Sequence, residues 1–204
     1  MRRDIALARL AVAVPILYFG TLLVAASTWT GYSHVTQYAS ELGSAAAPRP
    51  AIFNTGIVLM GVTTLAAALG LYGAAVAVGG RRAWAALGAA CVAAFGVSMV
   101  MGGLFPMPNP LHGAFGLGLA QVPAPLFLAL AVRGRPGLGG LVVTLFVTFV
   151  LLSGTMAVMM GVGQLVTRAN VGLWQRANAL VMIPWVGIAG HWLAEQAERS
   201  RPAA

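Results

Sequence analysis

Residues 138–162 read LGGLVVTLFVTFVLLSGTMAVMMGV, a run of 25 residues that contains no charged side chain. About 20 consecutive apolar residues, wound as a helix, cross the hydrocarbon core of a bilayer. Backbone N–H and C=O groups in hydrocarbon must be satisfied within their own segment. The stretch is therefore predicted to be a transmembrane helix and not a strand.

Other parts of the chain are equally apolar. Together with 138–162 they give six predicted spans, the other five being residues 8–28, 52–77, 84–104, 112–132 and 173–194. Of the 204 residues, 59% are hydrophobic and only 8% are charged, whereas a soluble domain of this length needs a far more polar surface. The chain is therefore predicted to be all-α, a single six-span transmembrane domain over residues 1–204.

The basic residues are arginines without exception, and they fall unevenly between the predicted spans. Nine of the twelve lie on the same side as the N-terminus: Arg2, Arg3, Arg9, Arg81, Arg82, Arg133, Arg135, Arg199 and Arg201. Only Arg49, Arg168 and Arg176 lie on the other side. Positive residues mark the cytoplasmic side, so both termini are predicted to be cytoplasmic. The absence of lysine suggests a GC-rich bacterial genome, and we expect a multi-pass protein of the bacterial cytoplasmic membrane.

The net charge of +8 does not indicate nucleic-acid binding, because the arginines stand singly or in pairs at helix ends without interleaved aromatic residues. Their expected partners are the anionic headgroups of membrane lipids. Cofactor motifs, such as a glycine-rich phosphate loop or a deep histidine pair for haem, are absent from the sequence. No cofactor is predicted, and the oligomeric state is left open.

The first outer loop, residues 29–51, is the longest connection, and long loops are often functional. Within it, Ser33 to Leu42 is predicted to form a short amphipathic helix at the membrane interface, with Ser33 as N-cap. His34 and Glu41 would share one face of that helix.

Glu41 is the only acidic residue predicted on the outer side. A carboxylate near hydrocarbon needs a partner, because an uncompensated charge there costs several kcal/mol. Arg176, about one turn inside the last span, is the best candidate. We therefore expect a Glu41–Arg176 pair.

His112 lies at the outer start of the fourth span, after a proline-rich connection. Its side chain suits a proton carrier, a metal ligand or an interfacial donor, and the simplest alternative is a hydrogen bond to a loop carbonyl. No spaced metal-binding motif accompanies it, so no metal site is predicted. Further polar residues expected on the same side are His34, Ser40, Asn54 and Gln175.

Several short motifs resemble a known family. They are Ser40-Glu41-Leu42-Gly43, Phe53-Asn54-x-Gly56, Gly103-Leu104-Phe105-Pro106 followed by His112, and Gln175-Arg176 at the last span. This pattern resembles the bacterial six-helix membrane family catalogued as domain of unknown function 998. The resemblance implies six spans and no established activity. It marks Ser40, Glu41, Asn54, Pro106, His112 and Arg176, while the acidic residue expected after Phe-Pro is missing here.

Three functions fit these residues. The first is binding of a lipid, a small amphiphile or a partner protein in an outer-face polar pocket, with Arg176, Asn54, Ser40, His34 and Gln175 as ligand-binding residues. The second is a membrane enzyme acting on a lipophilic substrate at the outer leaflet, with His112 as general acid or base and Glu41 orienting it. The third, a small transporter, is least favoured because the middle thirds of the spans contain no acid, base or histidine.

Overall fold

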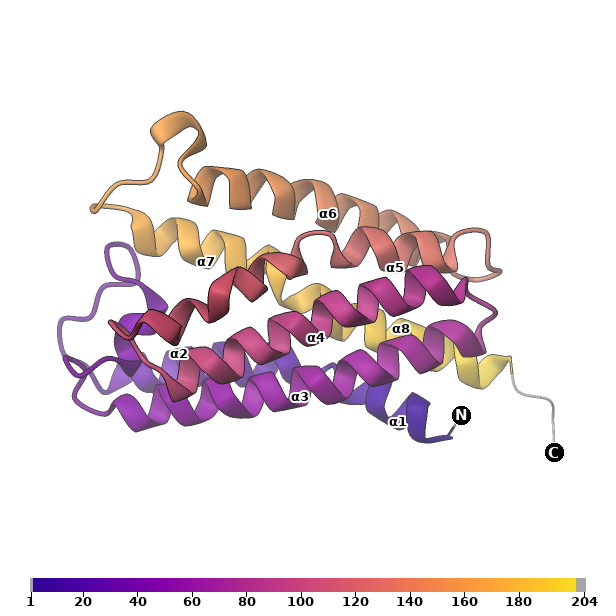
Figure 1. The fold of residues 1–204 in the computed structure, drawn as a ribbon, viewed down its shortest axis with the longest axis horizontal. Coiled ribbons are helices and arrows are strands. Elements are labelled where there is room, and N and C mark those ends of the chain that lie inside the picture. The colour runs from indigo at the N-terminus through magenta and orange to yellow at the C-terminus, as the bar shows by residue number, and fades with distance from the viewer. Residues whose placement is uncertain (1, 201–204) are drawn as a thin grey trace.

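A computed structural model describes residues 2–200, and its long helices lie side by side along one axis (Figure 1). Its helical elements are α1 (Arg2–Leu10), α2 (Ala13–Ser27), η1 (Ala39–Gly43), α3 (Pro50–Ala77), α4 (Arg82–Leu104), η2 (Pro110–Gln121), α5 (Ala124–Val132), α6 (Gly139–Met159), η3 (Val162–Gln164), α7 (Val171–Met182) and α8 (Pro184–Arg199).

These elements form six segments long and apolar enough to cross a membrane, which confirms the predicted all-helical, six-span class. The segments are Arg2–Ser27, Pro50–Ala77, Arg82–Leu104, Pro110–Val132, Gly139–Met159 and Val171–Arg199. The first and last extend further than predicted, because α1 and α8 continue as polar helical turns. Arg201 lies outside the described residues.

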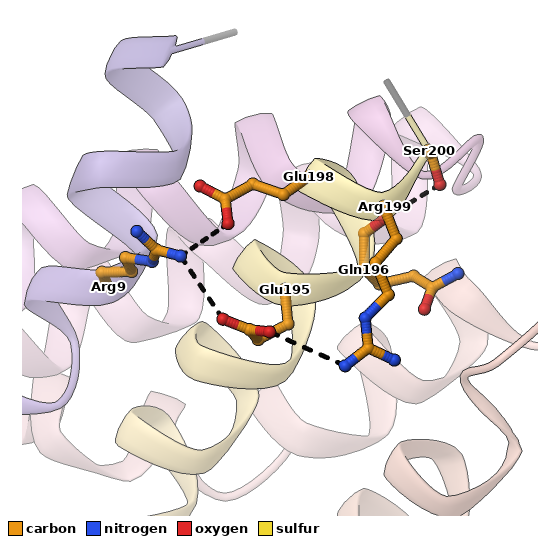
Figure 2. Close-up of polar contacts among 6 residues, drawn as sticks. All are labelled: Arg9, Glu195, Gln196, Glu198, Arg199 and Ser200. Atoms are coloured by element: carbon orange, nitrogen blue, oxygen red, sulfur yellow. Dashed lines mark hydrogen bonds and ion pairs between the residues drawn. The ribbon is translucent and has the colours of Figure 1, made fainter. Parts of the chain in front are cut away.

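The start of α1 and the end of α8 lie at the same end of the bundle, which we call the terminal end (Figure 1). There α1 and α8 are joined by Arg9, whose Nη2 lies 3.3 Å from Oε1 of Glu195 and 2.6 Å from Oε2 of Glu198. Figure 2 shows Arg9 between the two carboxylates, with Arg199 on the far side of Glu195. The opposite end, which carries the loop between α2 and α3, is called the loop end.

Three of the six segments are interrupted next to a proline. The breaks fall at Ala11–Val12 before Pro15, at Val122–Pro123 before Pro125, and at Ile183 before Pro184. A proline has no N–H, and its ring clashes with the carbonyl four residues earlier, so a helix kinks or breaks there. At the last break, Gln121 Nε2 donates to the carbonyl oxygen of Met182 at 3.1 Å. A side chain from a neighbouring segment thus satisfies the disrupted backbone, as hydrocarbon surroundings require.

Glycine lets α3 and α4 approach each other closely. A Cβ placed on Gly61 would lie 2.7 Å from the carbonyl oxygen of Gly96, and one on Gly96 would lie 3.0 Å from that of Gly61. In a membrane, helices associate through van der Waals contact and not through exclusion of water, so small residues at a crossing favour packing. This crossing holds the two helices that form one wall of the site.

The first loop contains a short helix, but that helix begins later than predicted. Residues 34–37 form turns, and η1, a 3-10 helix, starts at Ala39. The Ser33 hydroxyl accepts from the backbone N–H groups of Val35 and Thr36 at 3.3 and 3.2 Å, and Gln37 Oε1 accepts from the N–H of Ser33 at 2.9 Å. These local side-chain bonds compete with helical ones. The backbone carbonyl oxygens of residues 34–37 are therefore not used within a helix and can accept hydrogen bonds from other segments.

The start of the fourth segment also differs from the prediction. Residues 110–121 form the 3-10 element η2 and not a regular α-helix, and its backbone turns left-handed at Ala114 (φ 44°), Phe115 (φ 54°) and Gly116 (φ 79°). The Phe115 side chain is 86% exposed. Left-handed backbone costs roughly 1–2 kcal/mol for a residue with a Cβ. η2 is therefore a strained segment beside the site described next.

Candidate functional site

Arg176, on the first half of α7, makes four hydrogen bonds, three of them to the first loop and one to Gly172 on its own helix. Its Nε donates to His34 Nδ1 at 3.1 Å, and its Nη1 donates to the carbonyl oxygens of Gln37 and Gly172 at 2.8 and 2.9 Å. Its Nη2 donates to the Tyr32 hydroxyl. A guanidinium has five N–H donors in a fixed plane, so these contacts use most of them. We call these five residues the loop clasp.

The backbone completes the attachment of the loop to α7. The N–H of Leu173 donates to the carbonyl oxygen of Val35 at 3.0 Å, and the N–H of Ala39 donates to Gln175 Oε1 at 2.7 Å. Gly172 permits this contact, because a Cβ there would lie 2.7 Å from the carbonyl oxygen of His34 and 2.9 Å from that of Val35. The first N–H groups of a helix have no partner within it, so a loop carbonyl is a favourable cap.

Glu41 does not pair directly with Arg176, contrary to the prediction. Its Oε1 accepts from the N–H of Tyr38 at 2.8 Å and its Oε2 accepts from Gln37 Nε2 at 3.1 Å. Within residues 2–200, the salt bridges involve Arg9, Arg199, Glu195 and Glu198 and not Glu41. Gln37 connects the two charges, since its carbonyl binds Arg176 and its amide binds Glu41. Loop groups satisfy each charge, so a direct pair is unnecessary.

Burial and the charge of Arg176 shift the pKa values of two neighbouring side chains, His34 and Tyr32. The pKa of His34 is lowered, first by desolvation and then by the nearby guanidinium charge. The pKa of Tyr32 is raised, because desolvation outweighs the opposing effect of Arg176. His34 is therefore favoured as the neutral ring, whose Nδ1 lone pair accepts from Arg176. The loop clasp is a cation held by uncharged acceptors.

Behind the loop lies a cavity of about 370 Å³, which all six segments help to line. Its walls are mainly apolar: Phe53, Ile57, Phe95, Met99, Leu119, Met156, Met159, Ala179 and Met182. Its polar side chains are Tyr18, Ser40, Ser98, His112, Gln175 and Asn178. Arginine, aspartate and glutamate are absent from this lining, which consists of described residues.

The cavity therefore divides the predicted site residues into two groups. Ser40, His112 and Gln175 line it, whereas Glu41, His34, Asn54 and Arg176 lie outside its lining. Residues that the site prediction missed are Tyr18, Ser98 and Asn178. Helical periodicity offered a signal for Asn178, since it stands three residues after Gln175 on the same face of α7.

His112 is oriented by a backbone carbonyl. Its Nδ1 lies 3.0 Å from the carbonyl oxygen of Phe105, which can only accept, so Nδ1 donates. In the neutral ring this leaves Nε2 with a free lone pair. Among residues 2–200, Glu41 forms no bond to His112, so the predicted orientation of His112 by Glu41 is not found.

Four polar groups of the lining have unused hydrogen-bonding capacity. Within the described part of the chain, the Tyr18 and Ser98 hydroxyls, Gln175 Nε2 and His112 Nε2 have no hydrogen-bond partner. Tyr18 and Ser98 are both only 7% exposed, so bulk water reaches them poorly. Buried polar groups normally have partners, and such groups in a cavity suit a polar ligand.

Ser40 and Asn54 have structural partners. The Ser40 hydroxyl donates to Met107 Sδ at 3.0 Å, which ties η1 to the connection after α4. Asn54 Nδ2 donates to the carbonyl oxygen of Gly43 at 2.9 Å, which ties α3 to η1. Residues 2–200 contain no group of three or more His, Cys, Asp or Glu side chains that could hold a metal ion.

Comparison with known proteins gives one finding. The model of the family described as "Protein of unknown function (DUF998)" matches residues 11–192, nearly the whole chain. No curated protein and no solved structure matches significantly. The match confirms the resemblance carried by the short motifs.

Proposed function

The chain belongs to the DUF998 family, whose function is unknown, and from its own residues we propose that it binds an uncharged amphiphile in the cavity beneath the first loop. The observation that carries this proposal is the character of the lining. Its walls are mainly apolar, and its described lining contains no arginine, aspartate or glutamate. The volume of about 370 Å³ falls in the range of about 300–1,000 Å³ typical of small-ligand sites.

The lining selects the ligand by charge. An ionised headgroup in this cavity would lie among side chains that offer no countercharge, which costs several kcal/mol. A hydroxyl, ester or amide headgroup would find donors in Tyr18, Ser98 and Gln175 and an acceptor in His112 Nε2. The ligand class is therefore a lipid with an uncharged polar head, such as an acylglycerol or a long-chain alcohol.

Arg176 has a different role in this proposal. The loop clasp already uses four of its N–H donors, so the guanidinium holds the loop over the cavity and does not face an anionic ligand. Its position on α7 beside Gln175 couples the loop to the cavity wall. We therefore assign Arg176, His34 and Glu41 to loop attachment and His112, Gln175 and Ser98 to ligand contact.

The arginine distribution supports an orientation. The start of α1, the turn between α3 and α4 and the turn between α5 and α6 lie at the terminal end (Figure 1), and they carry Arg2, Arg3, Arg81, Arg82, Arg133 and Arg135. Positive residues favour the cytoplasmic side. We propose that both termini face the cytoplasm of a bacterial cell and that the cavity receives its ligand from the outer leaflet.

Binding of monoolein to the purified protein tests the proposal. Monoolein is uncharged, and oleyl sulfate, with a similar chain, carries a permanent negative charge. We expect monoolein to bind at least about tenfold more tightly, because a charged head loses its solvation in the cavity. Equal or tighter binding of oleyl sulfate would contradict the proposal.

Gly102 and Gly154 supply a matched pair of variants. Gly102 lines the cavity, and a Cβ there would meet its first neighbour, His112 Cε1, at 3.8 Å, so Gly102→Leu should fold and fill the cavity. A Cβ on Gly154 has nothing within 4 Å. Monoolein binding should disappear in Gly102→Leu and persist in Gly154→Leu. Release of oleate during the incubation would instead favour the enzyme alternative, with His112 Nε2 as the base.

A further inference from the structure

Two turns at the terminal end are joined and carry four arginines. The N–H of Arg81, between α3 and α4, donates to the carbonyl oxygen of Ala131 at 2.8 Å, at the end of α5. The Arg135 side chain lies over the first of these turns, since a Cβ on Gly79 would be 3.3 Å from its Nη1. Arg82 and Arg133 complete a group that we call the arginine turns.

Within residues 2–200, no salt bridge joins a carboxylate to the arginine turns. The salt bridges within residues 2–200 that have described partners belong to α1 and α8, where Glu195 and Glu198 are engaged by Arg9 and Arg199 (Figure 2). Arg135 is half-buried, and its Nε is a buried atom without a hydrogen-bond partner in the described chain. A buried donor on a charged group is costly to leave unpaired, so an anion at this place would be stabilising.

An apolar groove begins at the same place. Its volume is about 360 Å³, and it lies between α5 and α6, lined by Leu126, Ala129, Leu130, Arg133, Val142, Val143, Phe146 and Val147. Arg133 is the only charged residue of this lining, at the C-terminal end of α5. Val143 and Phe146 are 63% and 54% exposed, so the groove opens to the side of the bundle.

We infer that an anionic phospholipid binds here, with its phosphate at Arg133 and Arg135 and one acyl chain along the groove between α5 and α6. The guanidinium fork matches phosphate geometry. Basic groups between transmembrane helices on the cytoplasmic side are suited to anionic headgroups. The apolar groove would be filled by an acyl chain, which a free phosphate does not have. This site lies at the opposite end of the bundle from the cavity and does not depend on the ligand proposed for the cavity, and its cytoplasmic placement rests on the orientation proposed above.

Native mass spectrometry of the purified protein in detergent tests the site. The probes are dioleoyl-phosphatidylglycerol, the zwitterionic dioleoyl-phosphatidylcholine with the same chains, and soluble glycerophosphoglycerol without chains. We expect saturable binding of phosphatidylglycerol, weaker binding of phosphatidylcholine, and little binding of the chain-free headgroup. Glycerophosphoglycerol bound as tightly as the lipid would overturn the inference, because the groove would then be irrelevant.

Arginine variants locate the site. The double variant Arg133→Gln/Arg135→Gln should bind phosphatidylglycerol about 25-fold more weakly, from about fivefold per arginine near a membrane surface. The control Arg49→Gln/Arg168→Gln removes two exposed arginines from the loop end and should bind as the wild type does. Equal losses in both double variants, or no loss in the first at unchanged melting temperature, would overturn the inference.

Discussion

The two ends of the bundle use arginine in opposite ways. At the loop end, half-buried Arg176 is held by a hydroxyl, a neutral imidazole and two carbonyls. At the terminal end, Arg9, with a side chain 48% exposed, is held by two carboxylates. In the loop clasp, the charge of Arg176 lies where water is scarce. The stability of this end therefore depends on how many hydrogen-bond acceptors the loop supplies. The terminal ion pairs lie in water and salt, where pairing contributes little.

The largest difference should come from removing each arginine. Arg176→Ala leaves partly buried acceptors unpaired and should lower the free energy of unfolding by about 3 kcal/mol. Arg9→Ala should cost less than about 1 kcal/mol. SDS titration of the protein in mixed micelles measures both. Arg176→Lys keeps the charge but not the planar fork, so it should recover only part of the loss. Equal costs for the two alanine variants would remove the distinction between the ends.

The close approach of the loop to α7 gives the second effect. Gly172→Ala forces a Cβ against the carbonyls of His34 and Val35 and should cost about 2 kcal/mol. The control Gly154→Ala, in open surroundings on α6, should be neutral or stabilising by up to about 1 kcal/mol through helix propensity. Melting temperatures of the two variants should therefore shift in opposite directions or at least differ clearly. A stable Gly172→Ala protein would mean that the loop does not press on α7.

The third effect is a pH dependence confined to the loop end. The pKa of His34 is lower in the folded protein than its ordinary value of 6.5, so protonation favours the open or unfolded state. The contribution of His34 is therefore fully present above pH 6.5 and is lost as the pH falls through the lowered pKa. The stability difference between wild type and His34→Gln should shrink over that window in thermal melts. A difference that grows on acidification would contradict the neutral acceptor at Nδ1.

The smallest effect concerns salt. Because the Arg9 pairs are exposed, raising the salt concentration should reduce the stability difference between wild type and Arg9→Gln to near zero. The difference for Arg176→Gln should persist, since most of its contacts are part-buried hydrogen bonds to neutral groups. Double titrations of SDS and NaCl measure both. Equal salt sensitivity would show that the loop clasp is as exposed as the terminal pairs.

The spans could be predicted from the sequence because hydropathy and length alone determine which segments can cross a bilayer. The sequence also placed Ser40, His112 and Gln175 at one end, where they line the cavity. The different roles of Gln175 and Arg176 could not be predicted. Adjacent residues of a helix point about 100° apart, so Gln175 reaches the cavity and Arg176 reaches the loop. The direct Glu41–Arg176 pair failed for a related reason, since loop carbonyls and Gln37 were competing partners that charge patterns do not reveal.

Two further features could not be predicted from the sequence: the late start of η1 and the left-handed backbone of η2. Ser33 looked like a helix cap, yet its hydroxyl binds the N–H groups of a turn instead. Phe115 has a positive φ although its residue type disfavours it. The first feature comes from local bonds of Ser33 and Gln37, which compete with helical bonds and use the same residue types as a helix cap.

A cryo-EM map of the protein in nanodiscs made from its native membrane lipids would show whether the cavity beneath the first loop holds an uncharged lipid. We expect lipid density in the cavity, with its polar head within hydrogen-bonding distance of His112 and Gln175, while Arg176 still binds Tyr32 and the loop. A headgroup bound instead to Arg176, with the loop released and the cavity closed by its own side chains, would contradict it.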